Sequence, residues 1–181
     1  MLKHLVATLA LFTSVVFAGP KVSVETTLGS FVIELNQEQA PITVDNFLRY
    51  VDDGSYVGSQ FHRVIDGFMA QGGGFDAELN RLPTYASIKN EADNGLVNDA
   101  ATIAMARTND PDSASRQFFI NLVNNSFLNY SVRNPGYAVF GKVTEGFDVV
   151  QQMAEKPTAR KNRMQDVPVT PIVITKMERI Q

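Results

Sequence analysis

Polar and apolar side chains alternate in three short segments that have the pattern of β-strands. The residues concerned are Arg63 within Phe61–Ile65, Met69 and Gln71 within Phe68–Gln71, and Gln117 and Phe119 further along the chain. Side chains two residues apart in a strand share a face, so neighbouring strands could bring together a guanidinium, two amides and several apolar groups. Such a set offers hydrogen-bond donors beside an apolar surface. The pattern alone also fits an ordinary core beside a surface cation.

Composition excludes several other kinds of chemistry. The 181 residues include no cysteine and two histidines, His4 and His62, so there is no thiolate nucleophile, no disulfide and no multi-histidine metal site. A formal net charge of −3 provides no basic field for a nucleic-acid backbone. The motifs of serine hydrolases, zinc proteases and phosphate-binding loops are missing. His62 is interpreted as structural, and Gly72–Gly74 as a flexible or tightly turned loop.

The first 18 residues have the pattern of a secretory signal peptide. Lys3 precedes an almost wholly apolar run, and Val16 and Ala18 supply small residues at the −3 and −1 positions. The run is short for a membrane span, although an uncleaved anchor is the competing interpretation. We therefore expect cleavage after Ala18, a mature domain of residues 19–181, and no membrane attachment after cleavage.

The remaining chain alternates strand-like segments with turns and changes twice to a helical period. One helix is predicted to start at Pro41 and to end at Gly54, and another covers Phe147–Ala154. The predicted strands are Val22–Thr26, Phe31–Leu35, Phe61–Ile65, Phe68–Gln71, Thr102–Ala106, Phe118–Leu122, Ala138–Val143 and Ile172–Met177. This order predicts a mainly β fold, namely a closed antiparallel β-barrel capped by two α-helices. Closure would leave no exposed edge, so we expect a monomer.

Three runs carry a resemblance to a known family: Phe61–Gly73, Ser115–Ile120 and Tyr137–Val143. They resemble the cyclophilin family of peptidyl-prolyl cis–trans isomerases, and the resemblance extends over nearly all of the mature chain. It implies an eight-stranded antiparallel barrel capped by two helices, in agreement with the pattern of elements. Two further runs, Ile88–Leu96 and Thr102–Thr108, are similar to bacterial members. Together with the signal segment, this implies a periplasmic protein.

The resemblance also implies a site. Arg63 corresponds to the catalytic arginine of the family, and Gln71 to the glutamine that contacts the substrate backbone and orients that arginine. The other corresponding positions are the proline pocket at Phe68, Met69, Phe119 and Leu128, the stretch whose backbone pairs with the peptide at Ala106 and Arg107, and the groove wall at Gln117.

Three positions depart from the pattern of many eukaryotic members. Phe127 replaces a tryptophan, Tyr137 replaces a pocket histidine, and Arg107 replaces an asparagine. Phenylalanine has no indole N–H to donate, so cyclosporin binding is expected to be weak. Tyr137 keeps an aromatic body with a polar tip, and Arg107 keeps the backbone groups but changes the side chain at the groove.

The function implied by the resemblance is isomerisation of X–Pro bonds during the folding of exported proteins. The partners would be proline-containing unfolded or extended polypeptides, with no nucleic acid, no metal and no cofactor. Two other classes stay open: a non-catalytic peptide-binding chaperone on the same barrel, and a small-ligand carrier with an apolar interior. Intact Arg63 and Phe119 argue against the first, and a Phe-rich pattern that fills the interior argues against the second.

Overall fold

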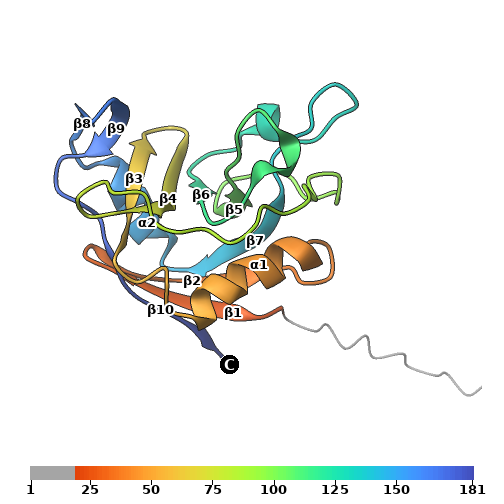
Figure 1. Ribbon diagram of the computed structural model, residues 1–181, viewed down its shortest axis with the longest axis horizontal. Helices are drawn as coiled ribbons and strands as arrows, with labels where there is room; N and C mark the ends of the chain where they lie inside the picture. The colour runs from red at the N-terminus through yellow and green to blue at the C-terminus, as the bar shows by residue number, and fades with distance from the viewer. Residues whose placement is uncertain (1–18) are drawn as a thin grey trace, which may run out of the picture.

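The computed structural model describes residues 19–181, so the predicted signal segment lies outside the described residues (Figure 1). Within this range the helices are α1 (Pro41–Asp52) and α2 (Phe147–Ala154), with short 3-10 turns η1 (Pro111–Ser113) and η2 (Ser126–Leu128). The strands are β1 (Lys21–Thr26), β2 (Gly29–Leu35), β3 (Ser59–Ile65), β4 (Met69–Asp76), β5 (Thr102–Met105), β6 (Phe118–Asn121), β7 (Val139–Glu145), β8 (Thr158–Lys161), β9 (Met164–Pro168) and β10 (Ile174–Ile180).

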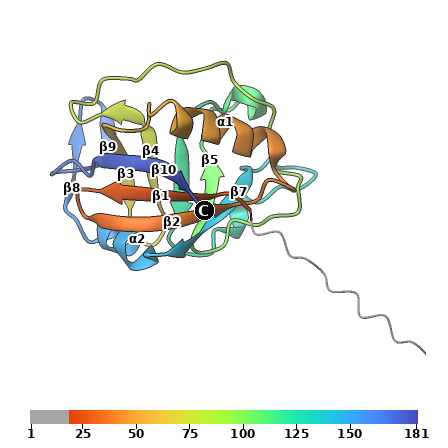
Figure 2. The ribbon, with the colours of Figure 1, turned by 90° about the horizontal axis from the view of Figure 1, so that it is seen from below.

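Eight of these strands form one antiparallel sheet in the order β10-β1-β2-β7-β5-β6-β4-β3. Figure 2 shows α1 lying across one end of the curled sheet and α2 near the other. The remaining two strands, β8 and β9, pair as a separate hairpin that packs against β3. The predicted mainly β architecture with two helices is therefore confirmed.

The predicted closed barrel is wrong, because the sheet is an open, curled half-barrel with β10 and β3 as its end strands. These two strands meet at an isolated bridge between Gln60 and Val173 rather than along a ladder. Pro171, just before this bridge, has no N–H to donate, and β3 shifts register twice between Ser59 and Arg63. A continuous ladder cannot form where one segment lacks a donor and the other is bulged.

In an open sheet, a monomer requires that the two end strands be protected from pairing with another copy of the chain. The β8–β9 hairpin packs along β3. On β10, the exposed surface carries the charged residues Lys176, Glu178 and Arg179. Charged side chains on an end strand oppose the addition of a strand from another copy. A monomer therefore remains our prediction.

Alternation along the strands divides the apolar side chains between two faces of the sheet. In β6, Phe118 and Ile120 belong to the interior core, whereas Phe119 between them belongs to a second group on the outside. The interior is filled by aromatic rings, such as Phe47 of α1 against Phe118 with their centroids 5.6 Å apart. A filled interior argues against the interpretation of the protein as a small-ligand carrier.

The second group is named here the outer-face cluster. Its buried members are Met69, Ala104, Phe119, Leu128 and Val139, and the partly buried residues packed against it are Ile65, Phe68, Leu96, Ala106 and Tyr137. They come from four adjacent strands, β4, β6, β5 and β7, and from the loops beside them. The curled sheet thus carries a small apolar surface on its convex side.

Gly72–Gly74 is part of β4 and does not form the predicted loop. A Cβ atom added to Gly74 would lie 2.5 Å from Cδ of Gln117, and Gly73 has a φ of +84°. A glycine run normally weakens a strand, which is why the pattern indicated a loop. Here the missing side chains let Gln117 lie across the strand, and this close approach is a tertiary contact.

Candidate active site

The strand register places three of the predicted site residues in one row across the sheet. Arg63 of β3 pairs with Gln71 of β4, and Gln71 pairs with Phe119 of β6. Phe119 in turn pairs with Ala104 of β5. Directly opposite residues have their Cβ atoms about 4.5–5.5 Å apart, so a guanidinium, an amide and an aromatic ring lie side by side.

The predicted proline-pocket residues meet in the outer-face cluster. Met69, Phe119 and Leu128 are buried members of it, and Phe68 packs against its edge. Phe68 stacks on Phe127 with ring centroids 5.7 Å apart, while Phe127 itself is 64% exposed. The cluster therefore offers an apolar floor with an aromatic wall that solvent, or a ligand, can reach.

The two predicted glutamines contact each other directly. Nε2 of Gln71 donates to Oε1 of Gln117 over 3.0 Å. This bond uses one N–H of the Gln71 amide, and the Gln71 Oε1 remains an acceptor on the residue that pairs with Arg63 across β3 and β4. The bonded pair therefore joins β4 to the start of β6 next to Arg63.

Ala106 and Arg107 follow β5 at the rim of the cluster. The N–H of Ala106 donates to the carbonyl of Gln117, but among residues 19–181 the C=O of Ala106 and both backbone groups of Arg107 have no hydrogen-bond partner. Such a free stretch can pair with an extended peptide by β-augmentation. The Arg107 side chain lies over the Tyr137 ring, 4.4 Å from its centroid, and its Nε donates to the carbonyl of Gly136. Tyr137 also meets Phe119 edge-on.

Arg116 positions the start of β6, a role that the sequence analysis missed. Its side chain is almost fully buried, and its guanidinium donates to the carbonyls of Gly73, Pro83 and Ser55. Gln117 follows Arg116 directly in the chain. Phe118 and Phe119, the latter a member of the outer-face cluster, come next. Arg116 precedes the predicted strand Phe118–Leu122, and a single buried arginine gives no periodic signal, so only the fold reveals these partners.

Asp166 is a second residue that the sequence analysis missed. Its Oδ2 lies 3.9 Å from Nε of Arg63, and the Arg63 side chain is 41% exposed. Asp166 lies on β9, a strand that was not predicted. The sequence signal was weak, because Asn162 and Arg163 form a two-residue turn with both φ angles positive but without the glycine that usually marks such a hairpin.

His62 is buried beside Phe75, with the ring centroids 4.7 Å apart, and its Nδ1 has no hydrogen-bond partner among the described residues. Burial lowers the pKa of His62 from 6.5 to about 4. The unfolded chain therefore binds a proton near pH 6.5, whereas the folded protein resists it until about pH 4. The neutral, enclosed ring agrees with a structural histidine.

Acidification is expected to destabilise the protein through His62. Stability should fall as the pH drops from about 6.5 to about 4, by roughly 3 kcal/mol from this group. Replacing His62 by glutamine should remove that part of the pH dependence. Urea unfolding of both proteins at about pH 7.5 and about pH 4.5 measures it. Equal pH dependences in the two proteins would show that His62 already accepts a proton in the folded state.

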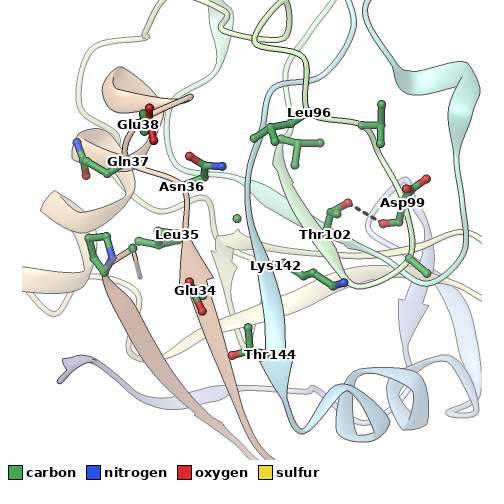
Figure 3. A pocket seen from close by; sticks show the side chains of 16 residues that line it. Glu34, Leu35, Asn36, Gln37, Glu38, Leu96, Asp99, Thr102, Lys142 and Thr144 are labelled. Atoms are coloured by element: carbon green, nitrogen blue, oxygen red, sulfur yellow. Dashed lines mark hydrogen bonds between the residues drawn. The ribbon is translucent and has the colours of Figure 1, made fainter. Parts of the chain in front are cut away.

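A separate pocket of about 810 Å³ lies over β2, β7 and β5, and it borders the outer-face cluster at Leu96 and Val139. Figure 3 shows Glu34 on β2, Lys142 and Thr144 on β7, and Asp99 on the opposite rim. None of the predicted site residues lines it. In the described part of the chain, His, Cys, Asp and Glu side chains form no group of three or more suited to a metal ion, and no helix is long and apolar enough to cross a membrane.

Comparisons with known proteins agree with this geometry. The family model described as "Cyclophilin type peptidyl-prolyl cis-trans isomerase/CLD" matches residues 21–179. A peptidyl-prolyl cis-trans isomerase of Streptomyces antibioticus is 55% identical over 156 residues, which are 84% of this chain and 94% of that protein. Another, from Acinetobacter baylyi, is 47% identical over 180 residues, which are 98% of this chain and 96% of that protein.

Solved structures show the same architecture. A crystal structure of a cyclophilin type peptidyl-prolyl cis-trans isomerase from Cryptosporidium parvum has a TM-score of 0.74 at 25% identity and covers 90% of this chain and 98% of that one. A second crystal structure of that protein, in the presence of the dipeptide Ala-Pro, also has a TM-score of 0.74 at 25% identity, over 89% of this chain and 99% of that one.

Proposed function

The chain belongs to the cyclophilin-type peptidyl-prolyl cis-trans isomerases, and from this premise we propose that Arg63 is its catalytic residue and that the outer-face cluster holds the substrate proline. The observation that carries the proposal is the cross-strand row in which Arg63, Gln71 and Phe119 are direct neighbours. This row places a permanent hydrogen-bond donor at the edge of an apolar surface.

The reaction requires only that the twisted amide be stabilised more than the planar one. Amide resonance opposes rotation about an X–Pro bond with a barrier of about 18–20 kcal/mol. At the twisted transition state the prolyl nitrogen recovers a lone pair, and a donor aimed at that nitrogen lowers the barrier selectively. The Arg63 guanidinium suits this role because it stays charged and presents fixed N–H groups.

Other groups in the site hold the substrate while the bond turns. Met69, Phe119 and Leu128 form an apolar floor for the pyrrolidine ring. The free backbone groups at Ala106 and Arg107 pair with the peptide chain on one side of the proline. With the ring fixed and the flanking chain paired, rotation is confined to the carbonyl that precedes the proline. Every step uses side chains and backbone of this chain, and none requires a metal or a cofactor.

The test of this site is isomerisation of an Ala-Pro peptide by the purified protein, followed together with binding of the same peptide by NMR. Peptide signals that shift with resonances of the outer-face cluster, together with faster cis–trans exchange, would support the placement. Exchange accompanied by shifts confined to the separate pocket around Glu34 and Lys142 would contradict it, because the active site would then lie over β2 and β7.

We also propose that the protein acts in the periplasm on exported polypeptides that contain proline. The support is the signal-peptide pattern of Met1–Ala18, with small residues before the expected cleavage site. Mass spectrometry of the periplasmic fraction should find a chain that begins at Gly19. Replacing Ala18 by arginine should block cleavage and accumulate the precursor. A soluble cytoplasmic chain that begins at Met1 would contradict both the localisation and the cleavage.

Cyclosporin is expected to bind weakly, because Phe127 offers an exposed apolar ring but no N–H at the position where many eukaryotic members have tryptophan. Phe127→Trp should tighten binding with little change in isomerase activity. Calorimetric titration of both proteins measures the difference. Tight binding by the unmodified protein would show that Phe127 does not control recognition of the drug.

A further inference from the structure

We infer that Asp166 is a positioning residue for Arg63: its carboxylate holds the guanidinium through Nε, so that the two terminal amino groups are left to face the prolyl nitrogen. The inference rests on the proposed catalytic role of Arg63. It concerns a contact between β3 and β9, two strands that lie about a hundred residues apart in the chain and come together only in the fold.

The contact is made by the side of the guanidinium that catalysis does not need. The Oδ2 atom of Asp166 lies 3.9 Å from Nε, rather than from a terminal nitrogen. Among residues 19–181, Arg63 forms no other ion pair and no side-chain hydrogen bond. A long side chain that is 41% exposed would otherwise sample many orientations.

A second polar residue lies next to Arg63 on the neighbouring strand. Gln71 is its direct neighbour across the β3–β4 pair, and one N–H of the Gln71 amide donates to Gln117. The oxygen of Gln71 is therefore the atom available to the guanidinium. Among residues 19–181 no hydrogen bond joins Gln71 to Arg63, so the ion pair with Asp166 is the polar contact that can orient the guanidinium.

Stability does not explain this arrangement. Ion pairs between exposed side chains contribute little to folding, and both partners here are partly exposed. Asp166 also has a φ of +59°, a left-handed conformation in which glycine would be less strained. Aspartate and asparagine tolerate this conformation better than most other side chains, so the backbone accepts the carboxylate at this position. The ion pair with Arg63 is the interaction that the Asp166 side chain makes.

The Asp166 carboxylate would slow the reaction if its charge weakened Arg63 as a donor. A negative charge near the guanidinium draws its N–H groups toward itself and weakens them as donors to the prolyl nitrogen. If this attenuation exceeded the benefit of orientation, removing Asp166 would accelerate the reaction. A fall in rate when Asp166 is replaced would therefore indicate that the carboxylate positions Arg63, and a rise would indicate that it weakens the donor.

The experiment compares Asp166→Asn and Asp166→Gly with the unmodified protein. Asparagine keeps the shape and tolerates the left-handed backbone, and glycine relieves it. Both should lower kcat/KM by about five- to tenfold, mostly in kcat, because orientation matters most in the transition state. Asp166→Gly should melt no lower than the unmodified protein. Asp99→Asn, an equal change of charge at the rim of the separate pocket, should leave both rate and melting unchanged.

A second arm tests whether Asp166 acts through Arg63. In an Arg63→Lys background, Asp166→Asn should cost little further activity, because lysine has no Nε–H between the carboxylate and the substrate. An unchanged or faster Asp166→Asn enzyme, or an equal loss in the lysine background, would overturn the positioning role. An Arg63→Ala enzyme as active as the unmodified protein would instead overturn the proposed catalytic role.

Discussion

Replacing Arg63 by alanine is expected to lower kcat/KM for an Ala-Pro peptide by about a hundred- to a thousandfold, the usual cost of one donor aimed at a developing charge. Peptide affinity should change far less, because the guanidinium is needed mainly when the prolyl nitrogen regains its lone pair. The fold should survive, since Arg63 lies on the outer face and is 41% exposed. Isomerisation kinetics, peptide affinity and a melting curve for the same variant measure these three expectations.

Two further substitutions separate the donor from the pocket. Arg63→Lys should also be a poor enzyme, because an ammonium on a flexible stem does not reproduce the planar donor. Phe119→Ala should weaken binding and turnover together by opening the apolar floor. Because Phe119 is only 4% exposed, this change should also cost about 3 kcal/mol of stability. A folded Arg63→Ala protein with the rate of the unmodified enzyme would leave peptide binding without catalysis as the role of this site.

Replacing Arg116 by methionine is expected to cause the largest loss of stability among single substitutions near the site. Arg116 is 2% exposed, and its guanidinium donates to three backbone carbonyls, those of Gly73, Pro83 and Ser55. Methionine fills part of the volume but leaves these acceptors unpaired, at a cost of about 3–5 kcal/mol. Urea unfolding followed by circular dichroism measures the loss, since the chain has no tryptophan for fluorescence.

Two controls define what that loss means. Arg116→Lys should recover only part of the stability, because one ammonium cannot reach three separated carbonyls. Arg133→Met removes an exposed arginine from a loop and should change stability by less than about 0.5 kcal/mol. If Arg116→Met unfolds at the same urea concentration as the unmodified protein, water has replaced the side chain and the start of β6 does not depend on it.

Local pattern was sufficient for most of the elements. The apolar spacing after Pro41 and within Phe147–Ala154 predicted both helices, because helix periodicity and end signals are properties of neighbouring residues. Alternation likewise indicated which side chains share a face, and this placed Gln117 with Phe119 and Met69 with Gln71. A match to family motifs then assigned roles that alternation alone left open between a site and an ordinary core.

Contacts between distant segments decided the remainder. The open sheet depends on how the segment after Pro171 meets a bulged β3, and the strand at Gly72–Gly74 depends on the side chain of Gln117 lying across it.

By itself, the sequence determined the family, the helices, the strand faces and the candidate catalytic arginine. Each of these follows from motifs or periodic patterns of residues that are close together in the chain. Only the tertiary structure decided that Arg63 has Asp166 as its ionic neighbour and that Arg116 holds the start of β6. The physical reason is that contacts between residues far apart in the chain produce no periodic pattern in the sequence, and their geometry exists only after the sheet has curled.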